Sequence, residues 1–149
     1  MTDTITILER LESRAAISDL IHLYALHIRN GMAAECTELF TEDATFEVRR
    51  GDLGNPAAVQ TISRSVGRIE IIESVTRSTA QARVCPLVQN LLIDVQGNEA
   101  TSNCMMVAQV LDKGFALLGE YHDRFRREDG WRFSARSYTI WGQIGAGTG

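Results

Sequence analysis

The stretch that decides the fold runs from residue 87 to residue 141 and reads LVQNLLIDVQGNEATSNCMMVAQVLDKGFALLGEYHDRFRREDGWRFSARSYTIW. Turn signals that contain glycine interrupt it at 96–98, 112–114 and 128–130. Strand-like segments joined by short glycine turns are typical of β-hairpins. The sequence therefore predicts four strands in an antiparallel meander, at 87–95, 100–111, 115–127 and 131–141.

The first half of the chain is mostly helical in its periodicity. Apolar residues between Ile5 and Asn30 recur at steps of three and four, which predicts one long helix that bends or breaks near Glu12 and Ser13 and ends at Gly31. Between this helix and the meander we expect a short helix at 33–40, a strand at 44–50, a helix at 57–67 whose first turn follows Pro56, and a stretch at 68–83 that could be strand or helix.

This order of elements predicts the fold class. Helices followed by a run of strands form α+β layers, in which helices cover one face of the sheet. A strongly curved, mainly antiparallel sheet that wraps around helices encloses a pocket at its open end. Pockets of this kind are common ligand sites. The 149 residues fit one domain, 1–149, without a linker or an internal repeat.

Composition excludes several classes of function. Fifteen Lys and Arg against nineteen Asp and Glu give a formal charge of -4, so no nucleic-acid partner is expected. No apolar run is long enough for a membrane span or a signal peptide, and the three cysteines are an odd number, so we expect a cytoplasmic protein with reduced thiols. The three histidines lack the spacing of metal ligands, and neither a metal nor another cofactor is expected.

Motifs along the chain point to one family. The segments 14–20 (RAAISDL) and 39–44 (LFTEDA), with Tyr24 and Gly31 between them, resemble the opening of SnoaL-like members of the NTF2-like superfamily. The second half is similar to the same family at 90–95 (NLLIDV), 119–123 (GEYHD), 129–133 (DGWRF) and Arg136. The resemblance covers about residues 8 to 140 and implies a cone-shaped fold around a pocket. It does not fix the chemistry, because the superfamily includes dehydratases, isomerases, dehydrochlorinases, polyketide cyclases, dioxygenase small subunits and non-catalytic binders.

The dehydratase and dehydrochlorinase branch commonly uses a helix Asp and a strand His as an acid–base pair. The position of the Asp, two residues before the glycine that ends the first helix, holds Arg29 here, and the position of the His holds Pro86. Proline does not ionise and arginine stays protonated, so neither can act as a general base. The usual dehydration mechanism of this branch is therefore not supported.

Other positions of the family's pocket are retained. The resemblance implies that Tyr24 and Arg136 face the pocket. Arg29 shares a helical face with Tyr24 and Ile28, so we expect catalytic roles for Tyr24, Arg29 and Arg136. We expect the ligand to be bound by apolar and aromatic residues: Ile28, Phe46, Leu87, Met106 and Trp141. Arg29 could instead complement the helix dipole or reach solvent, and Glu120 or Asp123 could neutralise Arg136.

Two functions follow from these residues. The first is an enzyme, a cyclase, isomerase or lyase, that acts without a cofactor on a small cyclic or aromatic metabolite; an anionic group on that ligand would suit two arginines. The second is a non-catalytic binding or accessory module, comparable to a dioxygenase small subunit. In both cases we expect a homodimer, because the open face of the curved sheet should expose apolar area.

Overall fold

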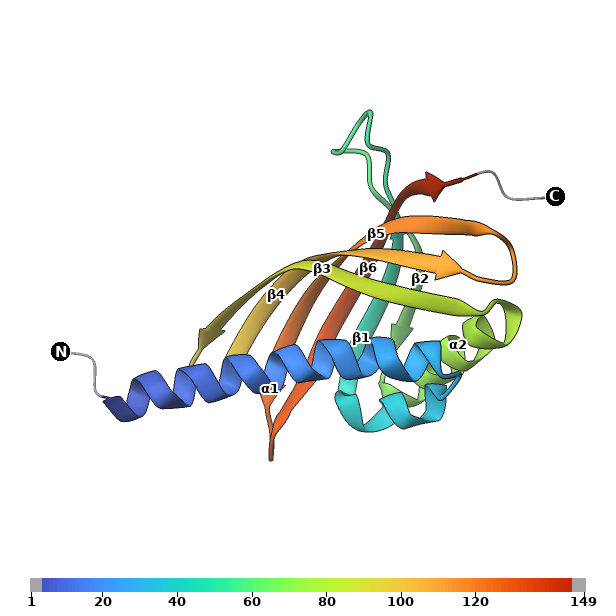
Figure 1. Cartoon of the computed structure of the whole chain (residues 1–149). Coiled ribbons are helices and arrows are strands. Elements are labelled where there is room, and N and C mark those ends of the chain that lie inside the picture. The colour runs from blue at the N-terminus through green and yellow to red at the C-terminus, as the bar shows by residue number, and fades with distance from the viewer. Residues whose placement is uncertain (1–3, 146–149) are drawn as a thin grey trace.

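The computed structural model describes residues 4–145. Two α-helices, one 3₁₀ helix and six strands follow one another along the chain (Figure 1). Their bounds are α1 (Thr4–Arg29), η1 (Ala33–Leu39), β1 (Phe40–Arg50), β2 (Gln60–Val66), α2 (Arg68–Gln81), β3 (Val84–Gln96), β4 (Glu99–Val110), β5 (Phe115–Arg127) and β6 (Trp131–Ile144).

The six strands form one mixed sheet in the order β2-β1-β6-β5-β4-β3. All neighbouring pairs are antiparallel except β1 and β6, which run parallel. The predicted meander of four strands is confirmed as β3 to β6. β3 and β6 are three or four residues longer than predicted, β4 is shifted by one residue, and β5 has the predicted bounds. Pro86 lies within β3, which the sheet tolerates because β3 is an edge strand and proline lacks the donor that an inner strand needs.

The helices cover one face of this curved sheet (Figure 1). Ile17, Ile21 and Tyr24 of α1 are buried, and they join Phe40 and Phe133 in the main core cluster. The steps of four and three between these α1 residues place them on one helical face, which explains why the helix packs on that face. The predicted α+β cone is therefore what the structure has. None of the helices described between residues 4 and 145 is long and apolar enough to span a membrane.

Three local predictions need correction. The helix expected at 57–67 is wrong: the chain turns after β1 and returns as β2, which pairs with β1 from Thr45↔Val66 to Arg50↔Gln60. The β-branched residues of this segment and the open edge of β1 favour a strand over helix propensity. The break expected near Glu12 and Ser13 is absent, since α1 is continuous. The ambiguous stretch at 68–83 is a helix, α2, through Gln81.

A bulge in β6 sets which side chains point into the core. Phe125 pairs with Phe133, whereas Arg124 pairs with Ala135, so Ser134 is an extra residue between two ladder positions. An extra residue shifts the alternation of side chains by one. Phe133 and Arg136 therefore both face the helices although they are three residues apart, and both are fully or almost fully buried.

Candidate functional site

A pocket of about 250 Å³ opens between the helices and the inner face of the sheet. Residues from α1, α2 and five of the six strands form its wall. The lining residues are Tyr24, Ile28, Phe46, Val48, Ser74, Val75, Ser78, Thr79, Val84, Pro86, Met106, Ala108, Leu117, Tyr121, Tyr138 and Ile140. None of these side chains carries a charge, so the apolar pocket suits a mainly apolar molecule.

The polar groups of the apolar pocket are hydroxyls. Tyr24, Tyr121 and Tyr138 form one end of it, which we call the tyrosine end. Their rings are neighbours: the ring centroids of Tyr24 and Tyr121 lie 6.4 Å apart, and those of Tyr121 and Tyr138 lie 5.2 Å apart. The hydroxyl of Tyr138 is buried and has no hydrogen-bond partner among residues 4–145. A buried donor without a partner lowers the stability of the fold.

A buried ion pair lies behind the tyrosine end. Arg136 Nε is 3.1 Å from Asp123 Oδ1, and both side chains are completely buried. The guanidinium carbon lies 3.5 Å from the ring centroid of Tyr121 and 4.4 Å from that of Tyr24. Ser102 donates a hydrogen bond from its hydroxyl to Asp123 Oδ2 at 3.4 Å. Cation–π contacts and the carboxylate thus stabilise a charge that would otherwise be expensive to bury.

Burial is the largest single effect on the pKa of each ionisable group in this cluster. It raises the pKa of Asp123 to about 6, although Arg136, Ser102 and His122 act in the opposite direction. The pKa of Arg136 is raised, because Asp123 and the neighbouring tyrosines outweigh the effect of burial. Burial also raises the pKa of Tyr121 to about 12 and those of Tyr24 and Tyr138 above their usual value. The three tyrosines are therefore neutral hydrogen-bond donors at pH 7, not bases.

Gly119 makes room for Tyr138. Gly119 faces the core on β5, and a Cβ atom at this position would collide with the ring of Tyr138. The absence of a side chain at Gly119 lets the Tyr138 ring lie flat over the strand and keeps its hydroxyl beside the glycine. The glycine of the GEYHD motif thus has a packing role next to the pocket.

The structure brings together some of the predicted site residues. Tyr24, Ile28, Phe46 and Met106 line the apolar pocket. Arg136 faces inward, as the resemblance implied, but Tyr24 and Tyr121 lie against its guanidinium and it does not line the pocket. Of the two acids considered as its partner, Asp123 pairs with it.

Three predicted site residues lie elsewhere. Arg29 is exposed at the end of α1, where its Nε donates to Asn30 Oδ1 at 3.5 Å, so the two arginines do not meet. Leu87 points away from the helices because it alternates with Pro86 and Val88, and it is 45% exposed. Leu118 pairs with Gly142 and Gly119 pairs with Ile140, so Trp141 is the extra residue of a second bulge in β6. Its Nε1 donates a hydrogen bond to Glu120 Oε2 at 3.1 Å. The structure therefore places these three residues outside the apolar pocket.

Sequence reasoning did not name Tyr121 and Tyr138 as site residues. Signals for both were present: Tyr121 is the centre of the GEYHD motif, and Tyr138 is two residues after Arg136 on one strand and so shares its face. Cys85 and His122 lie outside the apolar pocket. Within residues 4–145 no group of three or more His, Cys, Asp or Glu side chains could hold a metal ion.

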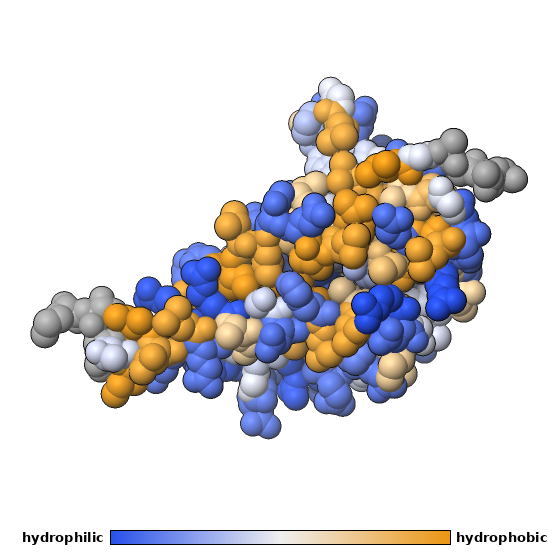
Figure 2. All heavy atoms as spheres, in the orientation of Figure 1, coloured by the Kyte–Doolittle hydropathy of each residue, from blue (hydrophilic) through white to orange (hydrophobic). Residues whose placement is uncertain are grey.

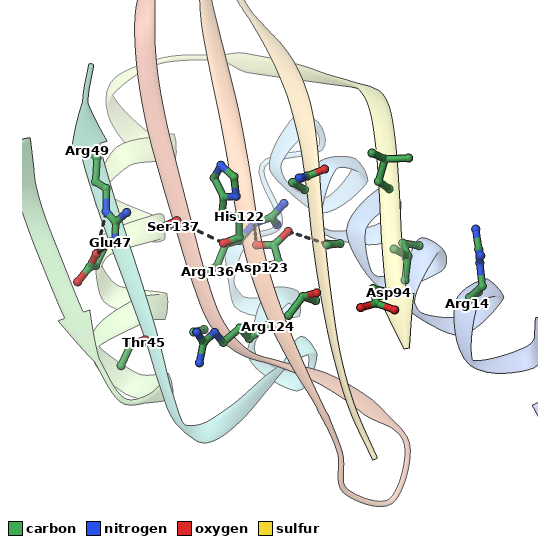
Figure 3. Close-up of a pocket in the computed structure, with 16 residues that line it drawn as sticks. Arg14, Thr45, Glu47, Arg49, Asp94, His122, Asp123, Arg124, Arg136 and Ser137 are labelled. Carbon is green, nitrogen blue, oxygen red and sulfur yellow. Dashed lines mark hydrogen bonds and ion pairs between the residues drawn. The ribbon is translucent and has the colours of Figure 1, made fainter. Parts of the chain in front are cut away.

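A second hollow, of about 740 Å³, lies over the outer face of the sheet (Figure 3). Polar side chains from β1, β5 and β6 project into it, among them Glu47, Arg49, His122, Arg124 and Ser137. Arg49 already donates from Nε to Glu47 Oε2 at 2.9 Å, and the Ser137 hydroxyl donates to the His122 carbonyl at 3.3 Å. Its charged side chains are of both signs, and Arg49 is already paired with Glu47, so they do not form a set that suits one small molecule. The apolar pocket is therefore the candidate functional site.

Comparisons with solved structures agree with this fold. The chain is similar to a hexachlorocyclohexane dehydrochlorinase, LinA type 2 (16% identity, 95% of this chain and 93% of that chain, TM-score 0.73). It is also similar to the β subunit of a proposed aromatic-ring-hydroxylating dioxygenase from Novosphingobium aromaticivorans (18% identity, 91% and 92% coverage, TM-score 0.72). A protein of unknown function from Mycobacterium tuberculosis is 25% identical over 90% of this chain and 75% of its own, with a TM-score of 0.71.

No curated protein matches the chain in sequence. The family model of the SnoaL-like domain matches residues 9–137, which is most of the chain and includes the tyrosines at 24 and 121 as well as the buried ion pair. The geometry of the cone and this match lead to one conclusion: the chain belongs to the family of SnoaL-like domains.

Proposed function

We propose that this protein binds a small, mainly apolar cyclic or aromatic molecule in the apolar pocket. The observation that carries the proposal is the lining: sixteen residues without a charged side chain around about 250 Å³. A cavity of about 150 Å³ lined by apolar residues accepts benzene, so this volume suits one substituted ring. Because the pocket holds no cation, a neutral ligand fits better than the anionic one that two arginines would have favoured.

The chemistry that this lining can assist is limited. Proton abstraction needs a base, and Tyr24, Tyr121 and Tyr138 are the only ionisable groups of the pocket. Their neutral hydroxyls can donate hydrogen bonds to an oxygen that gains negative charge, as in a cofactor-independent isomerase, lyase or cyclase that templates its substrate. The same lack of a base favours the second candidate, a non-catalytic binding or accessory module.

A pocket-filling variant tests the proposal. Ala108 lines the pocket and is buried, so Ala108→Leu should fill much of the space without adding polarity. Ala135→Leu makes the same change over the outer face and is the matched control. In a thermal-shift screen of small cyclic and aromatic molecules, ligands should raise the Tm of the wild type and of the Ala135 variant but not of the Ala108 variant. Equal shifts in all three proteins would contradict binding in this pocket.

Turnover separates the two candidate functions. The ligands found in that screen are incubated with the protein, and their products are compared with those of a heat-treated sample. Product above the heat-treated control that disappears in Ala108→Leu supports the enzyme. Tight binding of the ligands without product supports the non-catalytic module.

A homodimer remains part of the proposal, although for a different reason. The outer face of the sheet is mainly polar, which does not match the apolar face expected from the sequence. One group of exposed apolar side chains lies on the part of α1 that projects beyond the sheet, as Figures 1 and 2 show. They are Ile7, Leu8 and Leu11, with exposed fractions of 44%, 59% and 57%. Burying them against a second copy would remove this apolar surface from water.

Sedimentation tests the dimer. The wild type should sediment as a dimer at micromolar concentration, and Leu8→Glu with Leu11→Glu should shift it to a monomer. The matched change Glu9→Gln lies on the same exposed segment and should leave the dimer intact. A monomeric wild type would refute the proposal. A cytoplasmic location also remains a prediction, which cell fractionation checks.

A further inference from the structure

The wall that α2 contributes to the apolar pocket carries an inference about the class of ligand, and this inference rests on the proposed function. The sheet lines the pocket with apolar side chains and two tyrosines, whereas α2 adds Ser74, Ser78 and Thr79 beside Val75. Thr79 already donates its hydroxyl hydrogen to the carbonyl of Val75 or Thr76 within α2. Neither serine hydroxyl has a hydrogen-bond partner among the described residues. Both serines are therefore free to bind a polar atom of a ligand.

The two serines are also the most accessible hydroxyl groups of the lining. Ser74 is half-buried and Ser78 is exposed, and both line the pocket. The tyrosines are less accessible, since Tyr24 and Tyr121 are each 5% exposed and the Tyr138 hydroxyl is buried beside Gly119. The polar atom of a ligand should therefore face α2 and not the tyrosine end.

The spacing of the serines suits one oxygen atom. Ser74 and Ser78 lie one helical turn apart, so their side chains share a face of α2. Cβ atoms at this spacing are about 5–6 Å apart, and two O–H···O bonds of about 2.8 Å span a similar distance. One ligand oxygen can thus lie between the two hydroxyls. A hydroxyl group suits this position best, because it can accept a hydrogen bond from one serine and donate one to the other.

A wholly apolar ligand would not satisfy this wall. The half-buried hydroxyl of Ser74 can be hydrated while the pocket is open, and a hydrocarbon would displace that water without replacing its hydrogen bonds. A charged group would lose its own hydration and find no opposite charge in the lining. We infer that the ligand is a neutral ring compound with a hydroxyl group, a phenol or a cyclic alcohol, whose hydroxyl lies between Ser74 and Ser78.

Two probes of nearly the same shape test this inference: p-cresol and p-xylene, in which a methyl group replaces the hydroxyl. Their dissociation constants are measured by titration calorimetry at pH 7. The ratio of the Kd of p-xylene to that of p-cresol is then compared between proteins, because the different hydration of the probes cancels in that comparison. Ser74→Ala should lower the ratio about tenfold, since it removes a hydrogen bond to p-cresol and a hydroxyl that p-xylene would cover. Ser78→Ala should lower it severalfold, because the exposed Ser78 hydroxyl can keep part of its water.

The chain offers a matched control. Alanine is the best helix former, so both serine variants should fold. Ser18 is half-buried on α1 and does not line the pocket, so Ser18→Ala should leave the ratio unchanged. An unchanged ratio in Ser74→Ala would overturn the inference.

A third probe tests the choice of a hydroxyl over a carbonyl. The oxygen of p-tolualdehyde accepts hydrogen bonds but donates none. The double variant Ser74→Ala with Ser78→Ala should therefore lose more affinity for p-cresol than for p-tolualdehyde. The opposite order would overturn the hydroxyl and favour a carbonyl compound.

The hydrocarbon separates this inference from the proposed function. If p-xylene binds the wild type but not Ala108→Leu, the apolar pocket is a binding site whatever the serine variants do. An unchanged ratio in Ser74→Ala then overturns the inference alone. If none of the three probes binds the wild type, both the inference and the proposed function are overturned.

Discussion

Arg136 Nε lies 3.1 Å from Asp123 Oδ1 in the interior of the cone, and the guanidinium stacks 3.5 Å from the ring centroid of Tyr121. The terminal nitrogens of Arg136 have no hydrogen-bond partner among the described residues, so the carboxylate and the rings are its main compensation. The pair lies behind two tyrosines that line the apolar pocket, and its burial also affects the stability of the fold. It also makes the two members of the pair unequal, because a carboxylate can take up a proton whereas a guanidinium cannot lose one.

We therefore predict an asymmetry between two substitutions. Asp123→Asn leaves a buried cation without a counter-charge but also removes a carboxylate that is costly to bury. Because burial raises the pKa of Asp123 to about 6, its neutral form is tolerated in the fold, and we expect a loss of only about 1 kcal/mol in the free energy of unfolding at pH 7. Arg136→Met should cost less, because Asp123 can become neutral. Urea unfolding of the single variants and of the double variant Asp123→Asn with Arg136→Met measures the effect. The double variant should be more stable than Asp123→Asn alone, and the opposite order would contradict this account of the pair.

The raised pKa of Asp123 predicts an unusual dependence of stability on pH. In the unfolded chain an aspartate has a pKa near 3.9, whereas burial raises the pKa of Asp123 to about 6 in the fold. Between these values the folded protein keeps a proton that the unfolded chain has lost. The contribution of this group to the free energy of unfolding should therefore fall as pH rises from about 4 to 6 and stay constant above.

The double variant that lacks the pair isolates this contribution. Unfolding free energies of the wild type and the double variant are compared at pH 4.5 and pH 7, and their difference is followed. Carboxylates such as Asp43, whose pKa Arg126 lowers by hydrogen bonding, act in the opposite direction in both proteins and cancel. A difference that does not change with pH would mean that Asp123 titrates no differently in the fold than in the unfolded chain.

Gly119 should tolerate no side chain. Gly119→Ala places a Cβ against the Tyr138 ring, so we expect a loss of about 1–3 kcal/mol in unfolding free energy. Gly142→Ala is the matched control, because a Cβ there would meet no atom within 4 Å. Thermal or urea unfolding of both variants gives the comparison. Similar stabilities would show that the ring can move aside without cost.

Arg29 should have no part in ligand binding. Its side chain is exposed and does not line the apolar pocket, whereas the preceding residue, Ile28, does. Arg29→Ala should leave the affinity for a ligand found in the thermal-shift screen unchanged within error, and Ile28→Ala should weaken it severalfold through lost apolar contact. Titration calorimetry on the two variants shows whether Arg29 contributes to ligand affinity. Weaker ligand binding by Arg29→Ala would show that this arginine does take part in the site.

Much of the fold could be predicted from local sequence. The glycine turns after Val95, Leu111 and Arg127 and the apolar segments between them indicated the hairpins of β3 to β6, because turn chemistry acts over a few residues. The segment at 57–67 could not be predicted in this way. Its strand conformation depends on hydrogen bonds to β1, and Pro56 was a misleading local signal for a helix.

The candidate site was predictable only in part. Tyr24 and Ile28 were placed by motif and helical spacing, and Phe46 by its similarity to a position on the family's first strand. Met106 was placed because one of two consecutive strand residues must face inward; all four line the apolar pocket. Leu87 and Trp141 were misplaced because strand alternation gives two faces without saying which is inner, and bulges at 134 and 141 change the alternation. The position of the Tyr138 ring over Gly119 depends on the pairing of β5 with β6, which no single stretch of sequence reveals.

The sequence by itself determined the family, the order of most elements and the absence of an acid–base pair at positions 29 and 86, because these depend on residue identity and on spacing along the chain. The tertiary structure alone decided that Arg136 is paired with Asp123 behind a wall of tyrosines, that Arg29 faces solvent, and that the pocket carries no charge. The physical reason is that burial and pairing are relations between segments far apart in the chain. The register of a bulged sheet sets those relations.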